Sequence, residues 1–213
     1  MQRLREGDLV TADPHSTEVP PQGRTTAEWR TLTRLGNAVP AAHLWTGNPA
    51  FEALPDISAW PEGRAVVWSG SLAEGDPFAE ELRNWMSAGR EALESWCDRL
   101  VGPLASTGRT LLIRPHARQL LNDVAGVVRF LRRHRGERFG MAIAPIDLLT
   151  EEMRDDAAEH LRRSFEVLGP ILVPDRDLLI APAETSCGDA AQRSREACFA
   201  AANAHGLEVA TDA

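Results

Sequence analysis

The chain contains neither lysine nor tyrosine, so all of its permanently basic side chains are arginines. Chemistry that depends on a lysine is therefore excluded, including Schiff-base catalysis and phosphate binding by a P-loop lysine. The absence of tyrosine also excludes the tyrosine general acid that many dehydrogenases use.

Cysteine is scarce as well. The three cysteines, Cys97, Cys187 and Cys198, are an odd number without CxxC spacing, which favours free thiols in a reducing compartment. The N-terminal stretch has no apolar segment typical of a secretory signal, and no apolar run reaches about 18 residues. We therefore expect a cytoplasmic protein with no membrane partner.

Positive charge is in deficit, since the formal net charge is -8. A nucleic-acid partner is not expected, because proteins that bind the phosphate backbone usually present a basic face. The basic cluster at residues 132–135 follows a helical pattern, where cations suit the helix dipole.

What the sequence does contain is a regular alternation of apolar strands and amphipathic helices after an irregular start. Residues 1–23 carry three prolines among polar neighbours and predict an irregular N-terminal arm, and residues 24–213 predict a single domain. A short helix from Thr25 or Thr26 to Gly36 and a strand over 38–45 are expected at its start. Because strands separated by helices need crossover connections, the pattern predicts an α/β fold with a mainly parallel sheet.

Further elements follow from hydrophobic spacing. Helices are expected over 76–104, from Asn122-Asp123, from Thr150 to Leu168, and over 189–205, since apolar residues recur at three- and four-residue steps. Strands are expected in the apolar runs between them, as listed here: 65–68, 111–113, 141–144, 171–173, 178–180 and 207–209.

The segment from Thr110 to His116 is the best candidate for a functional site. An apolar strand ends abruptly at Arg114, Pro115 and His116, and binding groups collect at the carboxyl ends of parallel strands. An arginine can grip a carboxylate or phosphate, and a histidine can donate or exchange a proton. The alternative is a structural salt bridge from Arg114 to Asp147 or Asp175, and the sequence alone leaves both interpretations open.

The order and spacing of these elements resemble the xylose isomerase-like TIM barrels, which include the sugar phosphate isomerase/epimerase group. The resemblance covers about residues 38–181 and rests on the long helix, Gly108, the strand before Arg-Pro-His, Ala142-Ile-Ala-Pro145 and Val173-Pro-Asp175. It implies a (βα)-repeat parallel barrel of TIM type. Such a barrel usually takes about 250 residues, so we expect a shortened or incomplete one on the N-terminal side.

The resemblance also implies a divalent metal, manganese or magnesium, at the strand ends, where it would polarise a carbonyl group. The expected carboxylates are missing, because Arg114 occupies the first ligand position and Ala144-Pro145 the second. An arginine repels a divalent cation, so we predict that no metal is bound.

We therefore expect a small sugar-like or anionic metabolite to bind, with Arg114, His43, Trp45 and Arg118 as binding residues and His116 and Asp147 as catalytic candidates. Two alternatives remain: a non-catalytic interaction protein, in which a partner or a second copy covers exposed apolar faces, or a metal-dependent isomerase. In the second alternative the ligands come from Asp147, Asp175, Glu184 and His116.

Overall fold

A computed structural model describes residues 33–34, 37–38, 43–45, 47–60, 62–74, 76–182 and 188–211, the first three ranges as backbone only. The predicted arm over 1–23 lies outside these residues, as does Glu184. Thr33–Arg34 forms strand β1 instead of part of the expected helix, and the rest of that helix falls outside the described residues.

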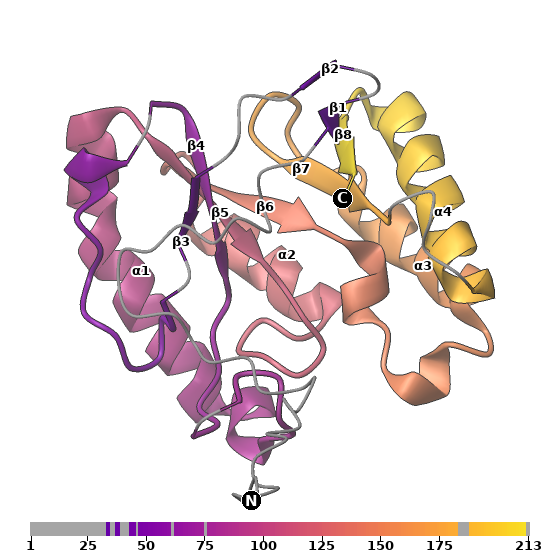
Figure 1. Cartoon of the computed structure of the whole chain (residues 1–213), viewed down its shortest axis with the longest axis horizontal. Coiled ribbons are helices and arrows are strands. Elements are labelled where there is room, and N and C mark those ends of the chain that lie inside the picture. The colour runs from indigo at the N-terminus through magenta and orange to yellow at the C-terminus, as the bar shows by residue number, and fades with distance from the viewer. Residues whose placement is uncertain are drawn as a thin grey trace, which may run out of the picture.

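The described part is an α/β structure with one sheet and four α-helices (Figure 1). The strands are β1, β2 (Asn37–Ala38), β3 (His43–Trp45), β4 (Arg64–Trp68), β5 (Thr110–Arg114), β6 (Phe139–Ile143), β7 (Leu178–Ala181) and β8 (Glu208–Thr211). The helices are α1 (Ser87–Thr107), α2 (Val124–Arg133), α3 (Ala157–Leu168) and α4 (Asp189–His205). Short 3-10 helices cover Ile57–Ala59 (η2), Leu82–Trp85 (η3), Pro145–Leu148 (η4) and Glu151–Met153 (η5).

Strands β3 to β8 are parallel and lie side by side in the order in which they occur in the chain, and β1 and β2 extend the β8 side in antiparallel pairing. Since each crossover steps in the same direction and crossovers are right-handed, all the helices fall on one face. In Figure 1, α1, α2 and then α3 and α4 follow one another across the view in sequence order. The α/β class and the parallel sheet are thereby confirmed.

Two separate hydrophobic layers cover the two faces of the sheet. Alternate strand residues such as Val67, Ile113 and Met141 pack with helix residues such as Trp96 and Phe130 in one large cluster. The intervening strand residues form a second cluster, made of Val66, Leu112, Ala142, Ala144, Leu178, Ile180 and Ala210. Every member of both layers is buried, as expected for a parallel sheet that is covered on both sides.

The barrel closure implied by the resemblance stays a prediction. Among the described residues the sheet ends at β2 on one side and at β3 on the other. A sheet whose parallel strands follow the chain order without a reversal has the strand sequence of a TIM-type barrel segment.

Besides the helix expected from Thr25 or Thr26, four predicted elements differ from the structure. The strand expected over 38–45 is not one strand, because Ala38 belongs to β2 and His43–Trp45 to β3, which lie at opposite ends of the strand order. The helix expected from residue 76 begins at Ser87, because Leu82–Trp85 forms a 3-10 turn whose Asn84 side chain bonds to neighbouring loops. The helix expected from Thr150 begins at Ala157, after η5. The strand expected over 171–173 is a turn, in which Val173 N–H donates to the Asp177 carboxylate.

The remaining strand and helix predictions agree with the structure to within a few residues. Asp123 caps α2 by accepting a hydrogen bond from Gly126 N–H, and Gly206 ends α4 in the left-handed conformation. In the described ranges, none of the helices combines the length and the apolar character needed to cross a bilayer.

Candidate functional site

The carboxyl ends of β4, β5 and β6 bring the predicted site residues together. The parallel register pairs Trp68, the last residue of β4, with Arg114, the last residue of β5. Asp147 lies in η4, which directly follows β6. The three side chains therefore meet at one edge of the sheet, and Arg114 and Asp147 are the two predicted site residues among them.

Arg114 forms a buried ion pair with Asp147. Its Nε and Nη2 atoms lie 2.8 and 2.7 Å from Asp147 Oδ2, and its guanidinium carbon lies 4.3 Å from the centre of the Trp68 ring. The Arg114 side chain is 6% exposed and that of Asp147 is 17% exposed. A charge at this depth needs a partner. The structural salt bridge, one of the two interpretations of Arg114, is thus present, and its partner is Asp147.

Asp175 is not part of this site. It precedes β7, where it adopts a left-handed backbone conformation with φ of 65°. Because β6 and β7 are parallel, the residues before β7 lie at the opposite end of the sheet from those after β6. The neighbouring Asp177 is 1% exposed and accepts from Met141 N–H and Val173 N–H, so it holds this turn against β6.

His116 is an uncharged imidazole with a defined tautomer at neutral pH. Burial, reinforced by the positive charges of Arg114, Arg118 and Arg154, lowers the pKa of His116 from 6.5 to about 4. Its Nδ1 atom accepts a hydrogen bond of 3.1 Å from Arg118 N–H, which assigns the ring proton to Nε2. His116 is therefore a hydrogen-bond donor through Nε2.

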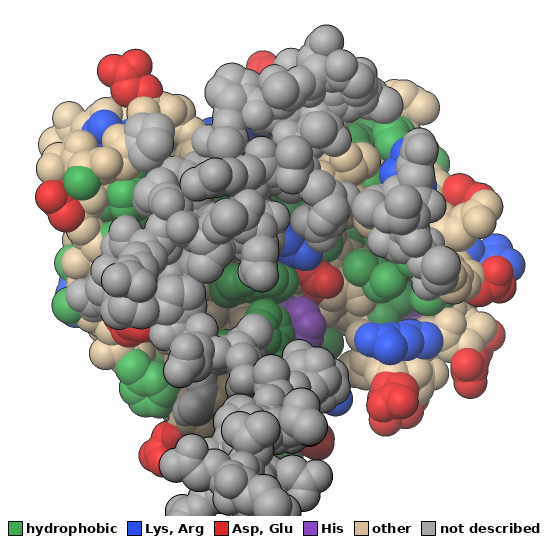
Figure 2. Space-filling model, in the orientation of Figure 1, with side chains coloured by type: hydrophobic (Ala, Val, Ile, Leu, Met, Phe, Trp, Pro, Cys, Tyr) green, Lys and Arg blue, Asp and Glu red, His purple; other side chains and the backbone are tan. Residues whose placement is uncertain are grey.

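Two aromatic rings flank His116. The Phe78 and Trp68 rings lie 5.0 and 5.9 Å from the imidazole, centre to centre, and both are nearly perpendicular to it. Phe78 and Trp68 also contact each other edge to face at 5.2 Å. In Figure 2 a basic, an acidic and a histidine side chain lie next to hydrophobic side chains in the middle of the face shown.

Arg118 is exposed and lies at the margin of this cluster. Its Nη1 atom donates to Phe78 O at 3.3 Å, and its backbone amide is the group that donates to His116. The exposed guanidinium makes Arg118 a suitable contact for an anionic group of a ligand.

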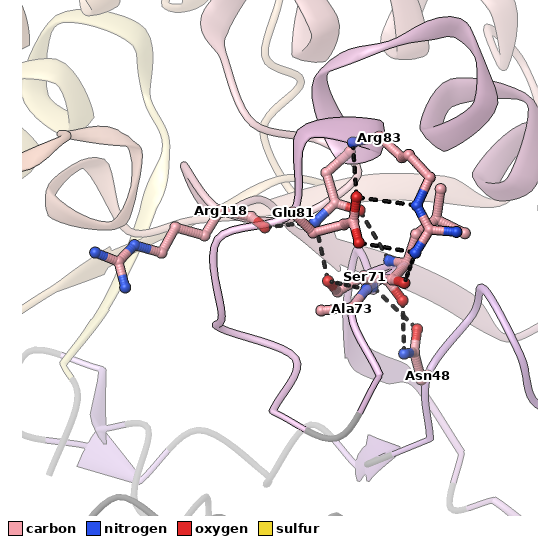
Figure 3. Close-up of polar contacts among 8 residues, drawn as sticks. Asn48, Ser71, Ala73, Glu81, Arg83 and Arg118 are labelled. Carbon is pink, nitrogen blue, oxygen red and sulfur yellow. Dashed lines mark hydrogen bonds and ion pairs between the residues drawn. The ribbon is translucent and has the colours of Figure 1, made fainter.

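The loop after β4 is fixed by a network of buried amide and hydroxyl groups (Figure 3). Asn84 is 2% exposed, and its Nδ2 donates to Ser71 Oγ and to Arg118 O, at 2.9 and 2.7 Å. Its Oδ1 accepts from Leu72 N–H at 2.8 Å. Asn48 accepts from Ser71 N–H and donates to Ser71 O. The network joins the loops after β4 and β5 into one unit.

The exposed pair of Arg83 and Glu81 extends this network. The guanidinium hydrogen bonds from Arg83 hold the pKa of Glu81 at about 2, and Arg83 Nη2 also donates to Leu72 O. In Figure 3 the two side chains face each other, whereas the guanidinium of Arg118 extends away from the network.

The loop that carries His116 is braced from several sides. Gln119 is 1% exposed and accepts a hydrogen bond from Ser69 Oγ. From the sequence alone a glutamine is expected to be exposed to solvent. Ala117 N–H donates to Asp147 O at 2.8 Å. The position of His116 is therefore set by the strands on both sides of β5.

His43 and Trp45, the other predicted binding residues, are placed only by their backbone. The register pairs them with Ala65 and Val67, which belong to the layer that faces the helices. Their side chains lie outside what the structure describes, so their role stays a prediction.

Three residues of the cluster were not among the predicted site residues. Trp68 was noted only as the end of a strand, and Phe78 and Asn84 were assigned to a helix that begins later. Trp68 could have been identified from the register of β4 against β5, because this register places the last residue of β4 beside Arg114. No pattern in the sequence marks Asn84, because the partners of its side chain come from residues up to 34 positions away.

The described residues around Asp147 do not fit a divalent metal. Asp147 is engaged by the Arg114 guanidinium, and His116 uses Nδ1 to accept a backbone hydrogen bond. Across the described ranges there is no group of three or more histidine, cysteine, aspartate or glutamate side chains suited to a metal ion.

The described cysteines do not supply a nucleophile. Cys97 and Cys198 are fully buried in the layer between sheet and helices, and burial raises the pKa of Cys198 to about 12. A thiol with so high a pKa stays protonated at neutral pH. Cys187 lies outside the described residues.

No known protein family and no curated protein matches the chain. Among solved structures, the apo form of 3-keto-D-glucoside 4-epimerase, YcjR, from E. coli matches with a TM-score of 0.41 and 15% identity over 69% of this chain. The match spans only 54% of that protein's length. Fold and site together define an α/β protein with a polar and aromatic cluster at the carboxyl ends of parallel strands.

Proposed function

We propose that the cluster of Trp68, Phe78, Arg114, His116 and Arg118 binds a small sugar-like metabolite, with an anionic group as an optional feature. The observation that carries the proposal is the neutral His116 ring, which offers an Nε2 donor and packs beside two aromatic rings. The location agrees with it, because ligands of parallel α/β sheets bind at the carboxyl ends of the strands.

Each group matches one part of such a ligand. The Nε2–H of His116, which has no hydrogen-bond partner in the described part of the chain, suits a hydroxyl or carbonyl oxygen. The half-buried rings of Trp68 and Phe78 suit the apolar face of a sugar. The exposed Arg118 guanidinium suits a carboxylate or phosphate.

Binding, rather than isomerisation, is the activity that we propose. A general base works best when its pKa lies near the working pH, and the pKa of His116 is about 4. Asp147, the second catalytic candidate, is held by Arg114 through two contacts to one oxygen. His116 is therefore not a base tuned for neutral pH, and the Asp147 carboxylate is engaged in the ion pair with Arg114.

Isothermal titration calorimetry of the full-length protein with sugar phosphates, sugar acids and neutral polyols tests this proposal. We expect His116→Asn to weaken all of the ligands that bind, and Arg118→Gln to weaken only the anionic ones, by about tenfold or more. Arg132→Gln is the control, since Arg132 is an exposed arginine on α2 with no contact to the cluster. No binding by any compound, or equal affinities in all variants, would show that the proposal is wrong.

A further inference from the structure

A patch of exposed apolar side chains lies on the 3-10 turn before α1 and on the residue that follows it. Leu82, Trp85 and Met86 are 68%, 45% and 62% exposed. Only three other large hydrophobic side chains of the described residues are exposed, and they are scattered over distant segments. An exposed group of apolar side chains on a protein surface marks an interaction site.

A small pocket adjoins this patch. It has a volume of about 110 Å³ and lies between the first turns of α1 and α2. The buried side chains of Leu93, Leu121 and Phe130 contribute to its lining, together with Trp85 and Met86. A cavity of about 150 Å³ holds a benzene molecule, so this pocket has room for one aliphatic side chain.

Two arginines without partners also line the pocket. Arg90 and Arg129 are exposed, and neither guanidinium makes an ion pair or a hydrogen bond within the described part of the chain. The acidic residue of the lining, Glu94, is directed to Arg133 at 3.6 Å. The pocket therefore carries unneutralised positive charge on a protein whose net charge is -8.

We propose that Leu82, Trp85, Met86, Arg90 and Arg129, together called the Trp85 surface, bind an acidic peptide segment of a partner protein. An apolar side chain of that segment enters the pocket, and carboxylates beside it pair with the two arginines. Charge complementarity favours this occupant, because a peptide with both features matches the apolar patch and its basic rim. A second copy of the chain fits less well, since two molecules of charge -8 repel each other.

Within the Trp85 surface, the side chain of Trp85 is held in place before a partner arrives. Trp85 Nε1 donates to Ala117 O at 3.0 Å, and the neighbouring Asn84 donates to Arg118 O. Fixed side chains lose little entropy on binding, which favours affinity. The same contacts join the surface to the loop that carries His116, so a partner here would bind next to the proposed metabolite site without using its residues.

Fluorescence anisotropy with the full-length protein tests the proposal. The probe is a fluorescein-labelled ten-residue peptide of alternating aspartate and leucine. Two matched peptides carry asparagine for aspartate or serine for leucine. We expect only the acidic apolar peptide to bind. We also expect both the double variant Arg90→Gln, Arg129→Gln and the double variant Leu82→Ser, Met86→Ser to weaken it about tenfold or more.

Matched controls distinguish specific binding at the Trp85 surface from non-specific electrostatic or hydrophobic binding. Arg132→Gln and Val167→Ser remove an exposed arginine and an exposed apolar side chain elsewhere and should leave binding unchanged. Failure of all three peptides to bind, equal binding by the asparagine peptide, or equal affinities in all variants would overturn the proposal. So would a dimer in light scattering that Leu82→Ser, Met86→Ser dissociates, because a second copy would then be the occupant. His116→Asn should not affect the peptide, so the two proposals can fail separately.

Discussion

Arg114 was predicted from the sequence to bind a ligand, and in the structure it also stabilises the fold. It is almost completely buried, stacked over Trp68 and paired with Asp147 of the next strand end. Removing one partner of such a pair leaves the other charge buried and uncompensated, whereas replacing both partners by apolar groups is far less costly.

The ion pair can be tested by a double-mutant cycle in urea denaturation. We expect Arg114→Met to lower the free energy of unfolding by roughly 3 kcal/mol. The double variant Arg114→Met, Asp147→Leu should recover at least half of that loss, since no unpaired carboxylate remains. An equal loss in the single and the double variant would mean that the pairing does not determine the stability of this strand end.

His116 is predicted to make stability depend on pH. The folded protein has a His116 pKa of about 4, below the usual value of 6.5, so the unfolded chain binds the proton first on acidification. The stabilisation is complete above about pH 6.5 and is lost between there and about pH 4, and it amounts to at most about 3 kcal/mol.

Urea denaturation between pH 4.5 and 7.5 measures this effect. His116→Asn keeps a side-chain acceptor near the Arg118 amide but cannot titrate, so its unfolding free energy should fall less on acidification than that of the wild type. His160→Asn on α3 is the control and should follow the wild type. A His116→Asn profile parallel to the wild-type profile would contradict the assignment of a neutral, buried imidazole.

At the scale of elements, the strands are defined by what packs on each of their faces. Gly140 in β6 shows the constraint most clearly. A Cβ atom added at Gly140 would lie 2.8 Å from Leu112 Cδ2 and 2.9 Å from Asp177 Oδ1. The glycine is therefore required by the close approach of β5 and of the turn before β7.

Alanine substitutions at two glycines test this packing argument. Gly140→Ala should lower the free energy of unfolding by about 1–3 kcal/mol, because neither neighbour can move without losing a contact. Gly102→Ala is the matched control within α1, since an added Cβ meets nothing within 4 Å there apart from its chain neighbours. Because Pro103 follows and disfavours a helical residue with a Cβ before it, the gain in helix propensity is partly offset, and stability should change by less than about 1 kcal/mol. Thermal denaturation of both variants gives the comparison, and a neutral Gly140→Ala would contradict it.

At the scale of the whole molecule, the strand order decides which residues can meet. Because β6 and β7 are parallel neighbours, Asp147 after β6 and Asp175 before β7 lie at opposite ends of the sheet. A metal site built from both is therefore ruled out by topology. The possible contribution of Glu184, the cytoplasmic location, the absence of nucleic-acid and membrane partners, and a homo-oligomer stay predictions.

We predict that divalent metals do not stabilise the protein. Thermal denaturation after treatment with EDTA, and again with Mn²⁺ or Mg²⁺ added in excess, should give melting temperatures within about 1 °C of each other, because a bound ligand would raise the melting temperature. A rise with Mn²⁺ that disappears in Asp147→Asn would restore the metal-dependent isomerase as the better interpretation.

The sequence by itself determined the α/β class, the parallel strands, most element positions and the meeting of Arg114, His116 and Asp147. These follow from local hydrophobic spacing, caps such as Asp123, and the rule that parallel strand ends share one edge. The predicted starts of α1 and α3 were wrong. The 3-10 turns η3 and η5 precede these helices, and the spacing of apolar residues does not distinguish such turns from the first turns of a helix.

Only the tertiary structure decided which partner each polar group takes. In the folded chain Arg114 pairs with Asp147 and not with Asp175. Burial and three nearby arginines lower the pKa of His116, so its ring is neutral. The Asn84 side chain forms hydrogen bonds to two loops. Hydrogen bonds and desolvation depend on distances between residues far apart in the chain, and those distances are set by the packing of the whole sheet and its helices.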